Sequence, residues 1–367
     1  MIIDELVAFS NFYGSNEELV LAGGGNTSAK DGDVMYIKGS GTKLATITAD
    51  GFVKMSREKL AEIFTKVYPD DDKTREAMSL KDLSDARLPG EEGRPSVETT
   101  LHSLFEFRFV LHLHPALVNG LCCGKDGQQI AAELFGDDVL WVEPCKPGYI
   151  LAKICHDLMA EYKNKKSKPA DILLLANHGV FVADDTVEGL GEKLGRVLGA
   201  ISSKVEREPD FTTGAFLPDK SQAAFDIIEK TFPEDYIITF EPSAEALMRA
   251  ESETAAAPLL MPFTPDHIVY CKAHPVYTEE VDNIPALVEA YKKEHGYLPK
   301  IILVKDCGFY AVDANLKGSE TAAMLFNDAL KIACFSEFFG GARQMSAELT
   351  DFIVNWEAES YRSKKNA

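Results

Sequence analysis

Two histidines stand two residues apart in a short apolar segment, Phe109-Val-Leu-His112-Leu-His114-Pro115. On an extended strand, alternate side chains face the same side and lie about 6.6 Å apart. Two imidazoles at that separation can bind one zinc-sized ion, because Zn–N bonds are about 2.0–2.1 Å long. Ordinary, partly buried histidines show the same spacing, so this pair alone does not define a metal site.

A third histidine occupies a break between two apolar segments. Residues 172–175 predict a buried strand, and residues 180–182 predict a second one after the turn Asn177-His178-Gly179. The glycine permits close approach of another part of the chain. His178 is therefore a candidate third ligand.

A carboxylate precedes the first two histidines. We expect a helix to begin near Ser96, and on that helix Glu98 and His102 share a face because they are four residues apart. Since this helix leads into the di-histidine strand, Glu98 could reach a metal or act as a general base. It could equally complement the positive end of the helix dipole. His102 is expected to be buried and hydrogen-bonded.

Two segments rich in Gly, Ser and Thr flank one predicted hairpin. Residues 23–28 follow a predicted strand at 19–22, and residues 38–42 follow a predicted strand at 34–37. Glycine backbone N–H groups together with Asn, Ser and Thr side chains can form an anion site. Either segment could also be an ordinary turn. Neither contains a Walker A motif or the dinucleotide-binding fingerprint.

Length and composition limit the possible functions. The chain has 367 residues, enough for two domains, and 46% of them are hydrophobic, as in globular proteins. Its formal net charge of −20 repels phosphate backbones, so we expect no nucleic-acid partner. Seven cysteines without zinc or disulfide spacing fit a reducing compartment. Without a signal peptide or an 18-residue apolar run, we expect a soluble, cytoplasmic protein that binds no membrane.

An internal repeat suggests the domain organisation. Residues 173–189 read LLLANHGVFVADDTVEG and residues 302–318 read ILVKDCGFYAVDANLKG, which places His178 opposite Cys307. We therefore predict a catalytic domain at 1–210 and a degenerate copy without a metal site at 211–367. The alternative is that strand-turn-helix units look alike by chance. Residues 69–94 are expected to be a long surface connection.

In their order and spacing, these motifs resemble those of the class II aldolase/adducin family. The resemblance is closest to the aldolase half of bifunctional rhamnulose-1-phosphate aldolase/short-chain dehydrogenase proteins. The resemblance rests on the segments at 23–28, 38–41, 95–102, 112–115, 147–152 and 177–179. It implies an α/β fold, a three-layer αβα sandwich with a mainly antiparallel central sheet. It also implies a homo-oligomer, often a tetramer, with sites at subunit interfaces. Within a single chain, the degenerate copy could take over one of the contacts that a neighbouring subunit makes in such an oligomer.

The resemblance also implies roles for individual residues. His112, His114 and His178 match the ligands of one Zn²⁺ per chain, and Glu98 matches the carboxylate that acts as acid and base. The positions that match the binding site of a substrate phosphate are Asn26, Thr27, Ser28, Ser40, Gly41 and Ser96. Val97 departs from the family's Ser-Ser-Glu pattern and removes one hydroxyl donor, so a carboxylate-bearing substrate is an alternative to a phosphate.

The expected chemistry is cleavage of a carbon–carbon bond next to a carbonyl. The leaving electrons form an enediolate, which a Zn²⁺ on three neutral imidazoles stabilises as a Lewis acid, while a carboxylate moves the proton. We therefore expect an aldolase that cleaves a ketose 1-phosphate, such as rhamnulose 1-phosphate, to dihydroxyacetone phosphate and an aldehyde. Alternatives are a sugar-phosphate 4-epimerase, aldol or decarboxylase chemistry on a carboxylate substrate, and a non-catalytic, adducin-like scaffold.

Overall fold

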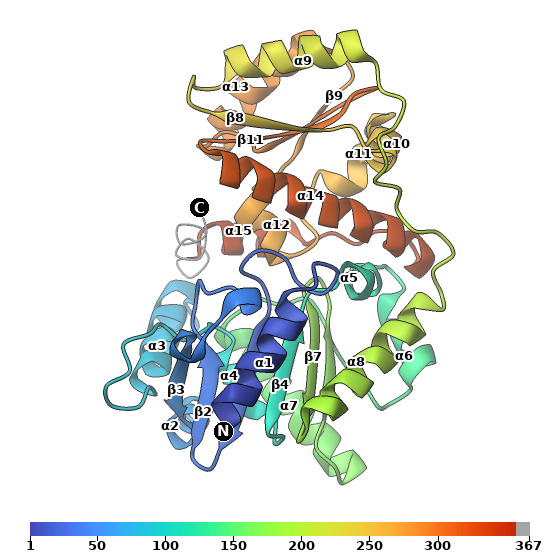
Figure 1. The fold of residues 1–367 in the computed structure, drawn as a ribbon. Helices are drawn as coiled ribbons and strands as arrows, with labels where there is room; N and C mark the ends of the chain where they lie inside the picture. The colour runs from blue at the N-terminus through green and yellow to red at the C-terminus, as the bar shows by residue number, and fades with distance from the viewer. Residues whose placement is uncertain (357–367) are drawn as a thin grey trace. The chain divides into compact units, whose positions relative to one another are not determined.

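Two compact units make up the chain. The computed structural model describes residues 1–356 (Figure 1). The first unit comprises Met1–Cys122 and Gly127–Lys204, and the second comprises Cys123–Asp126 and the described residues from Val205 onward. Each unit has a β-sheet of its own, with seven strands in the first and four in the second.

The sheet of the first unit has the strand order β3-β2-β1-β4-β7-β6-β5. All neighbouring strands are antiparallel except β5 and β6, which are parallel. The strands are β1 (Asn26–Asp31), β2 (Val34–Lys38), β3 (Phe52–Ser56), β4 (Phe109–Leu113), β5 (Leu140–Val142), β6 (Ile172–Leu175) and β7 (Gly179–Asp184). This confirms the predicted, mainly antiparallel sheet.

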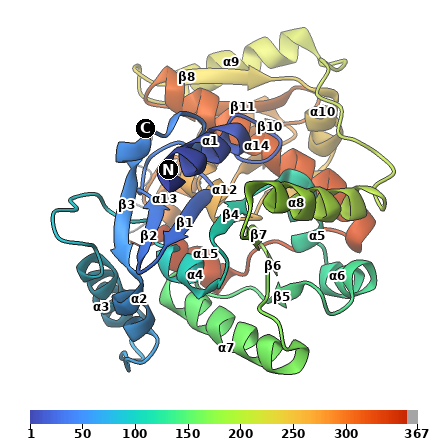
Figure 2. The ribbon, with the colours of Figure 1, turned by 60° about the horizontal axis from the view of Figure 1, so that its bottom comes forward.

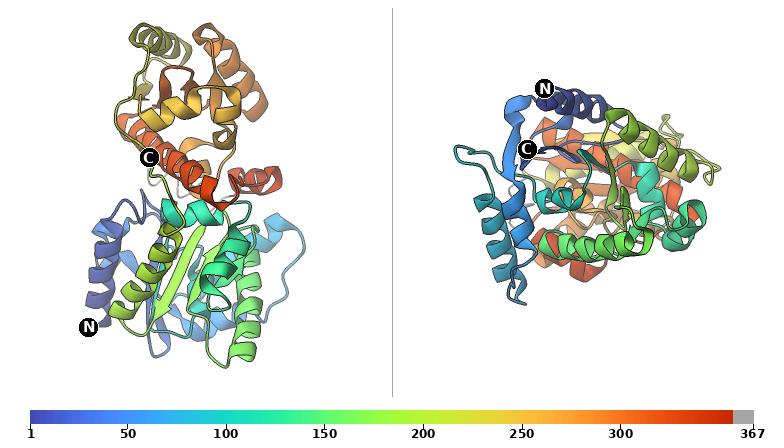
Figure 3. Two further views of the ribbon diagram at one scale, coloured as in Figure 1. Left: turned by 90° about the vertical axis from the view of Figure 1, so that its right-hand side faces the viewer. Right: turned by 90° about the horizontal axis from the view of Figure 1, so that it is seen from below.

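Helices cover both faces of this sheet, as the views in Figure 2 and Figure 3 show. On one face lie α1 (Ile2–Gly14) and α8 (Val187–Ser202), and the ring of Phe9 in α1 packs against Phe109. On the other face lie α4 (Thr99–Leu104) and α7 (Tyr149–Lys166), whose apolar side chains share a core with Val110 and Phe181. The result is the expected three-layer sandwich. The remaining helices are α2 (Arg57–Ile63), α3 (Asp72–Asp85), α5 (Ala116–Cys122) and α6 (Gly127–Phe135), with 3₁₀ turns at Leu44–Thr46 and Ala49–Gly51.

The second unit has a smaller sheet of the order β8-β11-β10-β9. Its strands are β8 (Ile237–Glu241), β9 (Val276–Thr278), β10 (Ile301–Val304) and β11 (Gly308–Asp313). Its helices are α9 (Pro218–Thr231), α10 (Ala244–Ala250), α11 (Glu253–Ala256), α12 (Pro265–Cys271), α13 (Ile284–His295), α14 (Leu316–Ser336) and α15 (Ala347–Val354), with 3₁₀ turns at Ala257–Leu259, Val281–Asn283 and Glu337–Phe339. Helices α9 and α13 share one core with the sheet, and Phe326 of α14 packs on Phe309 at the other face.

The sheet of the second unit repeats half of the first. The order β8-β11-β10-β9 corresponds to β4-β7-β6-β5, and in both sets only the last two strands are parallel. Asn177 and Asp306 take the same left-handed conformation, with φ of 55° and 63°. The helices that follow begin alike, because Thr186 and Asn315 each accept a hydrogen bond from the backbone N–H of a glycine three residues on. The two units therefore share this strand arrangement and the same start of the helix that follows it.

Two local predictions are wrong. Residues 19–22 form turns instead of a strand, and the neighbouring strand β1 begins at Asn26, inside the segment predicted to be a loop. Ala22 and Gly25 have positive φ, which breaks an extended run. Residues 69–94 contain helix α3, which Asp71 caps through the Thr74 N–H. Among residues 1–356, none of the helices combines the length and apolar character needed to cross a membrane.

Candidate metal centre

The three predicted histidines meet at one point of the first unit. His112 lies in β4, His114 follows the end of that strand, and His178 lies in the turn between β6 and β7. One ring nitrogen from each lies within 4.8 Å of the others. The Nε2 atoms of His112 and His114 are 2.9 Å apart. No other His, Cys, Asp or Glu group of this kind occurs among residues 1–356.

Strand pairing orients the ring of His112. Because β4 pairs with β7, His112 lies opposite Phe181. Its Nδ1 is 3.0 Å from the carbonyl oxygen of Val180. When Nδ1–H donates to that carbonyl, the lone pair of Nε2 faces the other histidines, which is the tautomer that a metal ligand needs. The ring of Phe181 lies parallel to that of His112 and limits its rotation.

Backbone geometry positions the other two histidines. Asn177 has a φ of 55°, and asparagine tolerates this left-handed conformation better than most residues. It turns the chain so that His178 projects toward β4. At Gly179 any Cβ atom would collide with the carbonyl oxygen of Leu113 and would come within 2.8 Å of Cδ2 of His114. Glycine therefore allows the His178 turn to approach the His114 segment closely.

Glu98 points at the same place. It is the N-cap residue of α4, and its Oε1 lies 3.2 Å from Nε2 of His112 and 3.0 Å from Nε2 of His178. Its Oε2 accepts a hydrogen bond from the side-chain amide of Asn26, which lies opposite His112 in the sheet. The Oε1 atom is buried and satisfies no hydrogen bond in the described structure. The carboxylate is thus aimed at the centre of the histidine group.

Burial sets the protonation of the centre. Desolvation lowers the pKa of His112, although the nearby Glu98 carboxylate opposes the shift. Burial raises the pKa of Glu98, but its charge interactions with His112 and His178 outweigh that effect and hold the pKa well below its usual range. Neutral imidazole and ionised carboxylate are the forms that bind a divalent cation.

His102 supports the centre without belonging to the histidine group. It is fully buried, its Nδ1 lies 2.8 Å from Oγ of Ser28, and its ring meets Phe181 edge-on. Desolvation lowers its pKa well below the usual value, so the ring is neutral. This is the buried, hydrogen-bonded role that was predicted for it.

The donor set fits a divalent metal ion. One imidazole in β4, one directly after it and one in the β6–β7 turn converge with one carboxylate, and such nitrogen-rich sets suit zinc and its first-row neighbours. The hydrogen bond from His112 to a backbone carbonyl is the partner that ligating histidines usually have. The group can therefore hold a metal ion, and its chemistry does not specify which one.

The structure places most of the predicted anion-binding residues near one another. Asn26 and Ser28 alternate on β1 and share the face of His112. Ser40 and Gly41 follow β2, where the Ser40 N–H donates to the carbonyl oxygen of Arg94 over 2.8 Å. Ser96, which is buried, lies two residues after Arg94 in the segment that precedes α4. The two segments are also joined by a β-bridge between Gly39 and Pro95.

Thr27 is not brought together with these residues. It lies opposite Leu111 in the sheet, so its side chain points to the face covered by α1. There its hydroxyl lies 2.7 Å from Oγ of Ser10. Sequence reasoning also missed Phe181, because an apolar residue in a buried strand looks like any core residue until its stacking partner is known.

The corresponding positions of the second unit contain no histidine. In the register of β8 with β11, Phe240 takes the place that His112 has in β4, and Cys307 takes the place of His178. Phe240 stacks on Tyr310 with ring centroids 4.7 Å apart, much as His112 stacks on Phe181. The pairing register is the same in both units, and in the second unit an apolar stack occupies the position that His112 has in the first.

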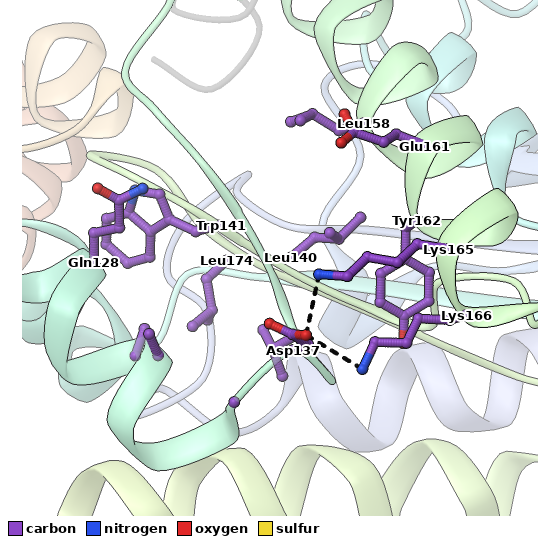
Figure 4. A pocket seen from close by; sticks show the side chains of 14 residues that line it. Gln128, Asp137, Leu140, Trp141, Leu158, Glu161, Tyr162, Lys165, Lys166 and Leu174 are labelled. Carbon is purple, nitrogen blue, oxygen red and sulfur yellow. Dashed lines mark hydrogen bonds and ion pairs between the residues drawn. The ribbon is translucent and has the colours of Figure 1, made fainter.

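A pocket of about 270 Å³ in the first unit is separate from this centre. Figure 4 shows its lining from α6, β5, β6 and α7, with Leu140, Trp141 and Leu158 among the apolar side chains. At its edge, Lys165 and Lys166 form ion pairs with Asp137. None of the predicted site residues lines it.

Comparison with known proteins identifies related chains. The family model "Class II Aldolase and Adducin N-terminal domain" matches residues 4–190. An uncharacterized oxidoreductase, YuxG of Bacillus subtilis (strain 168), is 25% identical over 408 residues, which cover 98% of this chain and 58% of that protein. The chain thus spans little more than half of the length of this relative.

Two solved structures are similar over 55% of the chain. One is the N-terminal class II aldolase domain of a conserved protein from Thermoplasma acidophilum, with 29% identity, 92% of that chain covered and a TM-score of 0.46. The other is an L-fuculose 1-phosphate aldolase, with 19% identity, 83% covered and a TM-score of 0.37.

Proposed function

Because this chain belongs to the class II aldolase and adducin family, we propose that it is a zinc-dependent aldolase that cleaves a ketose 1-phosphate to dihydroxyacetone phosphate and an aldehyde. One observation carries the proposal: Glu98 points its Oε1 at the point where His112 and His178 meet, 3.2 and 3.0 Å from their Nε2 atoms. A scaffold has no need to bury a carboxylate among three imidazoles, since an ionised group in the interior is costly unless it is paired.

The three histidines would hold the ion. Neutral imidazoles add no charge, so a divalent ion bound by His112, His114 and His178 keeps its full positive charge. Such an ion, when bound, supplies Lewis-acid stabilisation for the negative charge that develops next to the breaking carbon–carbon bond. Backbone contacts at Val180 and Gly179 keep the imidazoles in place before substrate arrives.

Glu98 would transfer the proton. An ionised carboxylate can take the proton of the substrate's hydroxyl during cleavage and return a proton to carbon afterwards, and such catalysis contributes about 10²–10⁴-fold. Asn26 donates to Oε2 and leaves Oε1 toward the histidines. In the proposed reaction Oε1 is therefore the oxygen that would transfer the proton.

The opposite end of the substrate would lie on the anion-binding residues. Hydroxyl, amide and backbone donors would come from Asn26, Ser28, Ser40, Gly41 and Ser96. The segment after β2 and the loop before α4 lie side by side there, joined by the bridge between Gly39 and Pro95. Anchoring the substrate there holds its reactive carbon against Glu98, which lowers the entropic cost of reaction. We favour a phosphate as the anion; Val97 in place of a serine keeps a carboxylate-bearing substrate as the alternative.

Other reactions remain as alternatives. An epimerase acting at C4 of a sugar phosphate, or an aldolase or decarboxylase acting on a carboxylate substrate, would use the same residues. A non-catalytic, adducin-like scaffold would not require them.

The role of the second unit is also a proposal. We propose that residues 211–367 are a degenerate copy of the catalytic domain at 1–210, with Phe240 and Cys307 at positions that hold ligands in the first unit. The oxidoreductase relative fits the resemblance to bifunctional aldolase/dehydrogenase proteins. We expect a cytoplasmic homo-oligomer that acts on a small sugar phosphate.

The test combines metal analysis with product analysis. Protein purified without chelator and reloaded with zinc is expected to bind one ion per chain and to release dihydroxyacetone phosphate from at least one ketose 1-phosphate, rhamnulose 1-phosphate being the first to try. His178→Ala should lose the ion, whereas His156→Ala, which removes a surface histidine, should keep it. An isomeric sugar phosphate without cleavage would indicate the epimerase, and carbon dioxide the decarboxylase. Less than one ion per chain after reloading would indicate the scaffold.

A further inference from the structure

The cavity of about 270 Å³ in the first unit lies apart from the three histidines. Helix α6, strands β5 and β6 and helix α7 border it (Figure 4). Its lining is mainly apolar and includes Ala131, Leu140, Trp141, Leu158 and Leu174. Because none of the lining residues belongs to the metal centre or to the predicted anion-binding set, a ligand in this cavity would be independent of the proposed reaction.

The indole of Trp141 forms a fixed wall of the cavity. Its Nε1 donates a hydrogen bond of 3.0 Å to Oε1 of Glu143. At Gly127, the first residue of α6, a Cβ atom would come within 3.1 Å of Cη2 of the same indole. The glycine therefore lets the ring lie against the start of α6, and contacts at two different atoms limit its rotation. The wall is thus in place before a ligand arrives.

A buried hydroxyl in the lining lacks a hydrogen bond. Only 5% of Tyr162 is exposed, and its hydroxyl has no hydrogen-bond partner in the described part of the chain. The exposed ammonium of Lys168 lies near this hydroxyl, which raises the pKa of the lysine, but its ion pair is with Asp138. Burying a hydroxyl without a hydrogen bond is costly, and native structures mostly avoid it. A ligand that offers a hydrogen-bonding group to Tyr162 would remove that cost.

The charged side chains of the lining balance one another. Lys165 and Lys166 form ion pairs with Asp137, over 3.2 and 3.5 Å. Glu161 also lines the cavity, so two ammonium groups stand against two carboxylates. An ionised ligand would therefore enter an apolar space that holds no free counter-charge for it, which is costly. An uncharged ligand avoids that cost.

We propose that this cavity is a second binding site, which takes an uncharged, mainly apolar molecule the size of two fused rings with one hydrogen-bonding group. An apolar cavity of about 150 Å³ holds benzene, so the volume here has room for a ring system about twice as large. The apolar walls contact the rings, and Tyr162 bonds to the polar group. A protein partner fits less well, because it would have to immobilise the long charged side chains of Glu161 and Lys165, which are exposed.

Three probes of similar shape test the proposed ligand class by calorimetric titration of the whole protein. 2-Naphthol is uncharged and carries one hydroxyl, naphthalene has no hydrogen-bonding group, and 2-naphthoate is ionised at neutral pH. 2-Naphthol should bind saturably, and 2-naphthoate should bind at least about 10-fold more weakly. Tyr162→Phe should weaken the binding of 2-naphthol about 3- to 10-fold and leave that of naphthalene unchanged.

Two matched variants test the place of binding. Ala132→Phe adds a ring to the cavity from an exposed position of α6 and should abolish saturable binding. Ala160→Phe makes the same change at an exposed position of α7 that does not line the cavity, and it should bind 2-naphthol like the wild type. Removal of zinc should leave the binding of 2-naphthol unchanged, since no lining residue belongs to the metal centre.

Four outcomes would overturn the proposal. If 2-naphthol does not bind the wild type, or still binds Ala132→Phe, or leaves with the zinc, the cavity is not its site. If 2-naphthoate binds as tightly as 2-naphthol, the ligand class is wrong. If Tyr162→Phe binds 2-naphthol like the wild type, the hydroxyl has no part in binding. If Ala132→Phe has a lower solution mass than Ala160→Phe, a second copy of the chain covers the cavity.

A measurement on intact side chains of the cavity covers the case in which Ala132→Phe does not fold. The chain has two tryptophans, Trp141 and Trp356, so the indole ¹⁵N resonance of Trp141 is assigned with Trp356→Phe. This resonance should move on addition of 2-naphthol, whereas that of Trp356 in the wild type should not. An unmoved Trp141 resonance at saturating 2-naphthol overturns the proposal.

Discussion

The ring of Phe181 lies parallel to that of His112, with centroids 4.0 Å apart and an interplanar angle of 12°. The contact joins β7 to β4 at the residue whose Nε2 faces the other two histidines. In the second unit the same strands carry Tyr310 and Phe240, stacked at 4.7 Å and 21°. The stack therefore follows from the strand register, and in the first unit one of its two rings is a candidate metal ligand, His112.

Phe181→Leu should weaken metal binding. Leucine keeps the position apolar but gives the imidazole of His112 no flat partner, so its orientation is less restricted. Loss of a supporting contact of this kind is expected to lower metal affinity by about 10-fold, within the range seen for groups that orient ligands. Competition with a chelator of known affinity measures the change. Phe240→Leu in the second unit is the control, and equal weakening by both variants would show that the stack acts only through general stability.

Gly179→Ala should disturb both stability and metal binding. The added methyl group would meet the carbonyl oxygen of Leu113 and the ring of His114, so the two segments must separate. We expect a loss of about 1–3 kcal/mol in the free energy of unfolding and a fall in metal affinity.

Gly308→Ala tests the same turn in the second unit. There the methyl group would meet the carbonyl oxygen of Glu241, at a φ of 106°. A similar loss of stability with unchanged metal affinity is expected. If Gly179→Ala binds metal as tightly as wild type, the proposed closeness of His178 and His114 is not needed for the site.

Glu98→Gln should separate metal binding from catalysis. Glutamine keeps the shape of the side chain but cannot accept the proton, so kcat is expected to fall by about 10²–10⁴-fold. Zinc content should stay at one ion per chain, because the three histidines are intact. Glu106→Gln, which changes an exposed carboxylate of the same unit, is the control. Activity within ten-fold of wild type in Glu98→Gln would remove Glu98 from the proposed role.

Lys30 should make stability depend on pH in the alkaline range. Burial, with a smaller contribution from Arg57, lowers its pKa to about 7 in the folded protein. An unfolded lysine has a pKa near 10.5, so between these values the unfolded chain holds a proton that the folded chain has released. Stability contributed by Lys30 therefore rises with pH across this window, by up to about 1.4 kcal/mol per pH unit.

Lys30→Met removes that dependence. Between pH 7.5 and 9.0 the free energy of unfolding of the wild type should gain about 2 kcal/mol relative to Lys30→Met, as measured by denaturant titration at both pH values. Lys43→Met, which removes an exposed amine from the same unit, is the control. Parallel pH profiles for wild type and Lys30→Met would contradict the prediction.

The sequence was sufficient for the elements that depend on local pattern. Alternation and strand-ending residues predicted β4 around His112, and the turn between two apolar runs predicted the β6–β7 hairpin around His178. Predictions from local pattern were wrong where a strand contains buried polar residues, as in β1, and where an apolar run forms turns, as at residues 19–22. Asn26, for example, begins a central strand because its backbone pairs with β4 and its amide with Glu98, which no local propensity indicates.

By itself the sequence determined which residue types are available for chemistry and at what spacing, because side-chain identity and strand period are local properties. Only the tertiary structure decided that Glu98 lies against His112 and His178, that Thr27 faces α1, and that Lys38 reaches Gly23. These relations depend on the pairing register of strands distant in the sequence. A shift of one residue in that register would turn strand side chains such as Thr27, Lys38 and His112 to the opposite face.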